Sequence, residues 1–149
     1  MDDAFDLTVR TAVYRHFATT GRSPTLDATA RATGAATGQV ISDAYQRLYA
    51  KRMLVPADDF TSIRMAPPFS GVATQHRVTV NRTPYFANCA WDSFGVVAAL
   101  GGTGDVASRC EQTLEPLELH LTPDGPPPSP WLFHCVVPAS KWWHDIVFT

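Results

Sequence analysis

The hydrophobic pattern of the first fifty residues predicts three consecutive helices. Apolar residues recur every three or four positions before Gly21, which places them on one face of a first helix. A second, short helix is expected over residues 25–33 and is closed by Gly34, and a third begins after Thr37, a good N-terminal cap. The apolar positions of the first helix are Phe5, Val9, Val13 and Phe17, and those of the third are Val40, Ile41, Ala44, Tyr45 and Leu48.

A short hairpin is predicted directly after these helices. Met53-Leu54-Val55 has the composition of a strand, Asp58-Asp59 favours a turn, and residues 60–65 can return as the partner strand. Three helices followed by a hairpin is the order of a winged helix-turn-helix. We therefore expect a winged-helix-like lobe over residues 1–66, with Pro67-Pro68 as a linker to the rest of the chain.

Alternation of apolar and polar residues beyond the linker predicts a second lobe over residues 67–149. One helix is expected to begin at Cys89, and the expected strands are residues 76–80, 83–86, 117–121 and 131–137. Residues 146–148 resemble the beginning of a further strand, so we expect the natural chain to continue. The fold class is α+β: a three-helix winged-helix-like lobe followed by a small mixed β-sheet lobe that carries one helix with catalytic-type residues.

Composition says more about the cellular location and the partners of the protein than about its activity. The 149 residues carry a formal net charge of −2, which gives no general attraction to nucleic acid or to an anionic membrane. Three cysteines do not form a secreted disulfide scaffold, the N-terminus is acidic, and no apolar run reaches the roughly 20 residues that span a bilayer. We expect a cytoplasmic protein with free thiols and no membrane partner.

The tetrapeptide Cys89-Ala90-Trp91-Asp92 is the main candidate for chemistry. A spacing of three brings the thiol and the carboxylate to one face of a helix. With Asn88 as the cap, Cys89 would lie in the first turn, where backbone N–H groups favour a thiolate, and Asp92 would act as a general acid. The plainer alternative is a buried structural cysteine beside a helix-start aspartate.

These residues, with their flanks, resemble the alkylmercury lyase (organomercurial lyase) family. The family's first catalytic motif is an aromatic residue, a short spacer, Cys-Ala-x-Asp and an apolar helix, and residues 85–100 fit it. Weaker similarity extends over Ser108-Arg109-Cys110, residues 115–123 and residues 136–149. The resemblance implies a winged-helix-like N-terminal lobe and a mixed α/β catalytic lobe.

The resemblance also implies an activity, which is protonolysis of a carbon–mercury bond. Cys89 would bind the mercury as a thiolate, because thiolates prefer soft metals, and Asp92 would donate the proton to the leaving carbon. No organic cofactor is implied, since mercury enters as part of an organomercurial small molecule. Small thiols, or a mercury-accepting protein thiol, are the expected partners that remove the product.

The second mercury-binding cysteine of the family is expected directly after Thr149. Cys110 aligns with a structural cysteine of the family, and Cys135 lies in the predicted strand at an aliphatic position. Cys135 could substitute for the missing ligand only where its strand lies against the Cys89 helix. A non-catalytic relative that binds mercury through Cys89 is therefore a further alternative.

A DNA-binding regulator that senses a thiophilic metal or small ligand is the alternative from another class. Residues 1–56 contain seven Lys or Arg and five Asp or Glu, which is a small excess of positive charge for a protein that binds duplex DNA. DNA is thus a possible partner that the charge does not favour. Four of the five histidines are considered as metal ligands, namely His76, His120, His134 and His144. They follow no zinc-binding spacing, and we expect them to be exposed or satisfied core residues.

Overall fold

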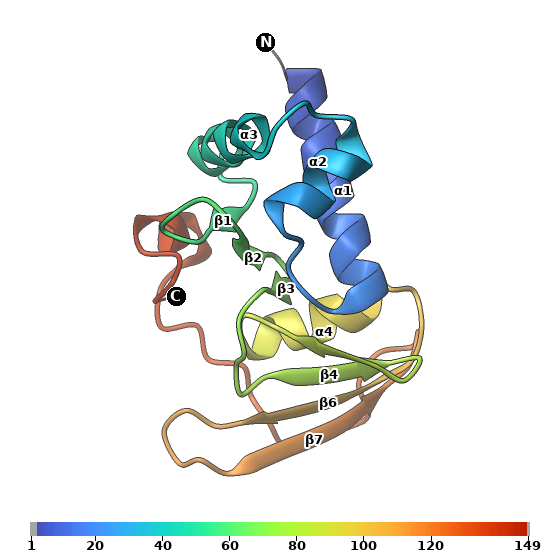
Figure 1. Ribbon diagram of the computed structural model, residues 1–149. Coiled ribbons are helices and arrows are strands. Elements are labelled where there is room, and N and C mark those ends of the chain that lie inside the picture. The colour runs from blue at the N-terminus through green and yellow to red at the C-terminus, as the bar shows by residue number, and fades with distance from the viewer. Residues whose placement is uncertain (1–2, 149) are drawn as a thin grey trace.

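The computed structural model describes residues 3–148 and begins with the three predicted helices (Figure 1). They are α1 (Asp3–Thr20), α2 (Leu26–Thr33) and α3 (Gly38–Ala50). The Thr25 hydroxyl caps α2 by accepting from the Ala28 N–H, and Thr37 caps α3 in the same way. Gly34 ends α2 with φ near +70°, a backbone conformation that glycine adopts without strain.

A three-stranded antiparallel sheet follows α3 in the order β1-β2-β3. Its strands are β1 (Val55–Pro56), β2 (Ile63–Ala66) and β3 (Phe69–Ser70). Pro67-Pro68, expected to be a linker, is instead the turn of the β2–β3 hairpin. The winged-helix interpretation and the division of the chain at residue 67 stay predictions.

A second sheet carries α4 (Ala90–Ala99) on one face. Its four strands pair in the order β5-β4-β6-β7, and they are β4 (Arg77–Val80), β5 (Thr83–Phe86), β6 (Gly104–Arg109) and β7 (Pro116–Leu121). The α+β class is confirmed, but all pairings between the described strands are antiparallel, where a mixed sheet was expected. The hydrophobic pattern did not predict β6, because Val106 is its one strong strand former; pairing with β4 and β7 on both edges supplies the rest.

The two sheets share one continuous hydrophobic core. Phe69 lies at its centre, stacks on Phe17 of α1 with ring centroids 5.7 Å apart, and contacts Tyr85 of β5 at 5.8 Å. The turn after α1 also approaches β5 closely, since a Cβ at Gly21 would lie 2.1 Å from the Pro84 carbonyl oxygen. Figure 1 shows α4 between the end of α1 and the face formed by β4, β6 and β7. α4 thus packs on β4 and β6, on the face of the sheet that is nearer to α1.

The C-terminal segment departs from the predicted pattern. Residues 131–137, expected to be a strand, pair with no described strand and are mostly exposed; we call them the arm. High strand propensity is not enough when no sheet edge receives the segment. A 3-10 helix, η1 (Ala139–His144), follows, and its Trp143 ring lies 6.4 Å from that of Tyr49. Residues 146–148, also expected to begin a strand, form a turn.

None of the described helices combines the length and the apolar character that crossing a bilayer requires.

Candidate functional site

Cys89 lies at the junction of β5 and α4 and is itself the cap of the helix. Its backbone is extended, with φ −148° and ψ 178°, and its Sγ accepts from the Asp92 N–H at 3.4 Å. Asn88 was expected to be the cap, with Cys89 in the first turn; the helix begins one residue later than that prediction. The thiol therefore faces the unpaired N–H groups at the start of α4 directly.

Asp92 lies in the first turn of α4, half-buried, and its backbone N–H donates to the Cys89 sulfur. Its Oδ2 accepts a hydrogen bond from Asn88 Nδ2 at 2.9 Å. Burial raises the pKa of the Asp92 carboxyl, and the bond from Asn88 opposes that rise without cancelling it. The side chain is consequently held closer to its protonated form than an exposed aspartate, which suits a proton donor.

Burial dominates at Cys89 as well and raises the pKa of the thiol. The Asp92 and Trp91 N–H groups act in the opposite direction, as expected of a helix start, but they do not outweigh the loss of hydration. The expectation of a thiolate favoured by the helix is therefore wrong in its net direction. Burial thus favours the protonated form of this thiol, and a soft metal that bound the sulfur would have to replace that proton.

The hydrophobic pattern gave no signal for the surroundings of Asp92. Asn88 Nδ2 also faces the carbonyl oxygens of Pro68 at 3.3 Å and Phe69 at 3.2 Å. Tyr14 of α1 donates its hydroxyl to the Pro67 carbonyl at 3.0 Å, and so binds the same β2–β3 turn. The absence of a side chain at Gly95 lets α4 approach this turn, because a Cβ there would lie 3.0 Å from that of Pro68. These contacts join elements far apart in sequence.

The other two cysteines lie in different surroundings. Cys110 is half-buried in the β6–β7 turn, and Cys135 is exposed on the arm. The arm passes the start of α4: the Phe133 and Trp91 ring centroids are 5.5 Å apart. Cys135 is also near enough to add slightly to the rise in the pKa of Cys89, which burial causes in the main. Its predicted strand is absent, but the segment does lie beside the Cys89 helix.

The histidines are partnered or exposed rather than clustered. His76 is buried, and its Nδ1 lies 2.7 Å from Ser108 Oγ, while the exposed His120 lies 2.7 Å from Asp105. His134 and His144 are exposed. Within residues 3–148, no group of three or more His, Cys, Asp or Glu side chains is arranged to hold a metal ion.

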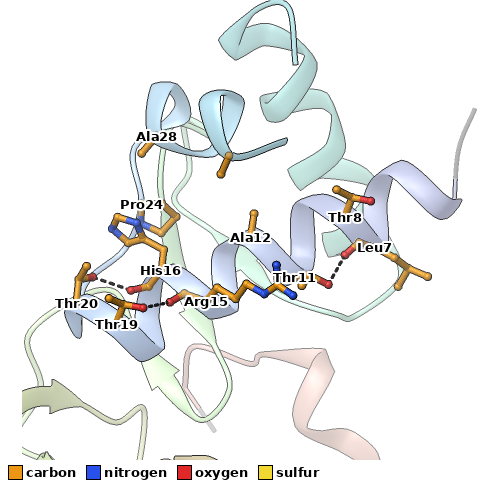
Figure 2. A pocket seen from close by; sticks show the side chains of 11 residues that line it. Leu7, Thr8, Thr11, Ala12, Arg15, His16, Thr19, Thr20, Pro24 and Ala28 are labelled. Atoms are coloured by element: carbon orange, nitrogen blue, oxygen red, sulfur yellow. Dashed lines mark hydrogen bonds between the residues drawn. The ribbon is translucent and has the colours of Figure 1, made fainter. Parts of the chain in front are cut away.

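Two open grooves lie on the N-terminal helices rather than at Cys89. Figure 2 shows one of about 530 Å³ between α1 and α2, where threonine hydroxyls donate to carbonyls of their own helix, as Thr11 does to Leu7. The second, of about 370 Å³, is lined by Tyr14 and Phe69 and by Leu100 at the end of α4. The first groove has no contact with the thiol or the acid, and the second approaches them only through Tyr14 and Phe69.

Basic residues of α3 are engaged within the protein. Arg47 Nη2 lies 2.8 Å from the buried carboxylate of Asp6, and Lys51 Nζ lies 3.0 Å from the same side chain and 2.7 Å from Asp3. These pairs join α3 to α1. They also neutralise two of the cations that a duplex-reading helix would present to phosphate.

Comparison with known proteins places this site in an enzyme family. A model of the alkylmercury lyase family, MerB, matches residues 69–149, more than half of the chain and the part that holds Cys89 and Asp92. The chain therefore belongs to the alkylmercury lyase family, as its motif predicted.

A solved structure carries the same fold. The mercury-bound form of MerB2 superposes with a TM-score of 0.65 over 86% of this chain, at 22% sequence identity. The chain spans 60% of the length of that solved chain. No curated protein matches the sequence.

Proposed function

We propose that this protein is a carbon–mercury lyase that cleaves organomercurials by protonolysis, with Cys89 as the mercury ligand and Asp92 as the proton donor. One observation carries the proposal: a thiol and a carboxyl group with a raised pKa lie within one turn at the start of the same half-buried helix. Membership of the alkylmercury lyase family supports this choice of reaction.

The first step is exchange of the mercury onto Cys89. The substrate is an organic group bonded to mercury, which also carries a small thiolate. A bond forms between the Cys89 sulfur and mercury, the small thiolate leaves, and it takes the proton of the Cys89 thiol. A protonated thiol is sufficient here, since mercury replaces the proton and a soft sulfur ligand is preferred.

The second step is proton transfer from Asp92 to the carbon. The electron pair of the carbon–mercury bond forms the new carbon–hydrogen bond, so the products are a hydrocarbon and a mercuric ion held on sulfur. Asp92 is left as a carboxylate and regains a proton from water. A small thiol supplies the second sulfur, and further thiols remove the ion. Positioned proton donors typically contribute a factor of about 10² to 10⁴.

The test is a single-turnover reaction with phenylmercury and excess small thiol, followed by gas chromatography of benzene. We expect benzene from the unaltered protein, none from Asp92→Asn despite retained mercury binding, and neither binding nor benzene from Cys89→Ser. Cys110→Ser is the matched control and keeps both. Tight binding without benzene in the unaltered protein would contradict the lyase and leave a non-catalytic mercury-binding relative.

Cys135→Ser, run in the same assay, examines the second sulfur. With small thiol in excess, the variant is expected to release benzene at the unaltered rate. If benzene release by Cys135→Ser falls only when the small thiol is limiting, Cys135 supplies the second sulfur ligand of mercury from the arm. The position of the arm beside Trp91 makes the measurement worthwhile.

The winged-helix DNA-binding regulator ranks below the lyase, because Arg47 of α3 and Lys51, which follows α3 as its C-terminal cap, are paired with acidic residues of α1. Its signature would be duplex binding that weakens steeply with salt and survives both Cys89→Ser and Asp92→Asn. That result, without any benzene release, would reverse the ranking.

A further inference from the structure

The Asn88 side chain joins the proposed acid to the β2–β3 turn. Its Nδ2 has two hydrogens and faces three oxygens, at 2.9 Å on Asp92, 3.2 Å on Phe69 and 3.3 Å on Pro68. Turning the amide over would place its carbonyl oxygen against all three oxygens, so its orientation is dictated by its surroundings. The shortest of the three contacts is the one to Asp92.

The anchor on the other side of this amide is rigid. Pro68 and Phe69 lie in and just after the β2–β3 turn, Phe69 is buried in the shared core, and the Tyr14 hydroxyl holds the adjoining Pro67 carbonyl at 3.0 Å. Asn88 Oδ1 is also buried and receives no hydrogen bond from residues 3–148. The amide therefore leaves one buried acceptor unpaired while its donors serve the turn and Asp92, an arrangement that costs stability.

We infer that Asn88 is a positioning residue for the proton donor: it holds Asp92 by Oδ2 and leaves Oδ1 as the oxygen that carries and delivers the proton. An N–H donor pairs best with an unprotonated carboxyl oxygen, so the acidic proton resides on the other one. Catalytic use of this proton rests on the proposed function, whereas the placement of Asp92 does not.

The same bond acts again when the proton leaves. Hydrogen bonds to an ionised carboxylate are shorter and stronger than those to the neutral acid, so Asn88 favours the state that proton transfer produces. Burial acts in the opposite direction and raises the pKa of Asp92. Asn88 thus makes a buried acid a better donor without exposing it to water.

The test is a titration of Asp92 in mercury-free protein. The carboxyl carbon is followed by ¹³C NMR in aspartate-labelled protein, and its signal is assigned by its loss in Asp92→Asn. Asn88→Leu removes the amide at similar volume, and we expect the pKa of Asp92 to rise. Asn88→Ala, which removes the same donor at smaller volume, takes its place where the leucine variant does not fold.

Two control variants separate positioning from general loosening. Gln39→Leu removes an exposed amide that donates to Asp43 at 2.8 Å with the same four-residue spacing, and should leave Asp92 unchanged. Tyr14→Phe removes the bond to the Pro67 carbonyl and keeps the Asn88–Asp92 hydrogen bond, and it also removes a hydroxyl that lies near enough to Asp92 to interact with it electrostatically. An unchanged or lowered pKa of Asp92 in the Asn88 variant would overturn the inference. An equal rise in Tyr14→Phe would also overturn it, because the turn would then be the positioning element.

Catalysis adds an independent readout. In the benzene-release reaction, Asn88→Leu should slow single turnover by about a hundredfold, the lower end of the loss that follows removal of a donor to developing charge. It should also move the alkaline loss of activity to higher pH, since Asp92 stays protonated longer. If the pKa of Asp92 rises in Asn88→Leu but the unaltered protein releases no benzene, the inference stands and the proposed function fails. If the unaltered protein releases benzene but the pKa of Asp92 does not rise in Asn88→Leu, the proposed function stands and the inference fails.

Discussion

The start of α4 and the arm, residues 131–137, each carry a cysteine two residues from an aromatic residue, but the two thiols lie in different surroundings. Cys89 is half-buried, caps a helix and lies one turn from an acid. Cys135 is exposed on a segment that belongs to no sheet. The chemistry proposed for Cys89 therefore depends on the residues that enclose it, since the residue type is the same at both positions.

The enclosure is built by the core that the two sheets share. Phe69 provides a carbonyl for Asn88, stacks on α1 and contacts β5. Among residues 3–148, the arm forms one pair of contacting aromatic rings, between Phe133 and Trp91. If the comparison is right, matched changes in the two regions will differ in size and in kind, as the following predictions state.

Phe69→Ala and Phe133→Ala make the same chemical change in the two regions, and the largest difference is expected here. Phe69 is 3% exposed, so its truncation should lower the free energy of unfolding by about 3–5 kcal/mol. Phe133 is 48% exposed, and the same truncation should cost less than about 1 kcal/mol. Urea unfolding followed by circular dichroism measures both. Equal losses would mean that the arm is part of the core.

Local signals made the start of α4 predictable. The prediction needed only residues close together in sequence, namely Cys89, Asp92 and the apolar run after them. The predicted helix begins a single residue before α4. The arm was predicted wrongly for the converse reason: its composition favours a strand, but a strand also needs a partner edge. Asn88 was predicted only as the helix cap. Its contacts with Pro68 and Phe69, and the contact of Tyr14 with Pro67, were missed because they span 19 to 53 residues of sequence.

A second prediction uses the raised pKa of Asp92. An acid whose pKa is raised by folding stabilises the protein only while protonated, so this contribution is full below the unfolded pKa near 3.8 and is lost as the pH rises through the folded value. Asp92→Asn cannot ionise. We expect it to match the unaltered protein near pH 3.5 and to become progressively more stable above that, by about 1.4 kcal/mol per unit of pKa shift.

Urea unfolding at several pH values from 3.5 to 8 gives this difference directly. A gap between the two proteins that stays constant across the range would contradict a raised pKa at Asp92. A gap of opposite sign at neutral pH would mean that the carboxylate is stabilised in the folded protein.

Alkylation should distinguish the two thiols themselves. Cys135 is exposed, whereas burial both covers the sulfur of Cys89 and raises the pKa of that thiol. We expect iodoacetamide to modify Cys135 at least about tenfold faster at pH 7.5, because the thiolate is the reacting form. Peptide mass spectrometry over time measures both rates in one sample, and Cys135→Ser shows whether the rate at Cys89 is independent. Faster modification of Cys89 would mean that the helix start outweighs burial.

The smallest effect is expected where the two regions meet. The Trp91 and Phe133 rings lie 5.5 Å apart, and aromatic pairs contribute about 0.5–1.5 kcal/mol beyond burial. Trp91→Ala should therefore free the arm and raise the alkylation rate of Cys89 by roughly twofold to tenfold. Phe133→Ala should produce the same rise, and the double variant no further one, since either change removes the whole contact. Leu132→Ala is the control on the same arm, 91% exposed, and should change nothing. If the rises in the alkylation rate of Cys89 add in the double variant, the arm does not cover the thiol through this ring pair, and the core alone buries Cys89.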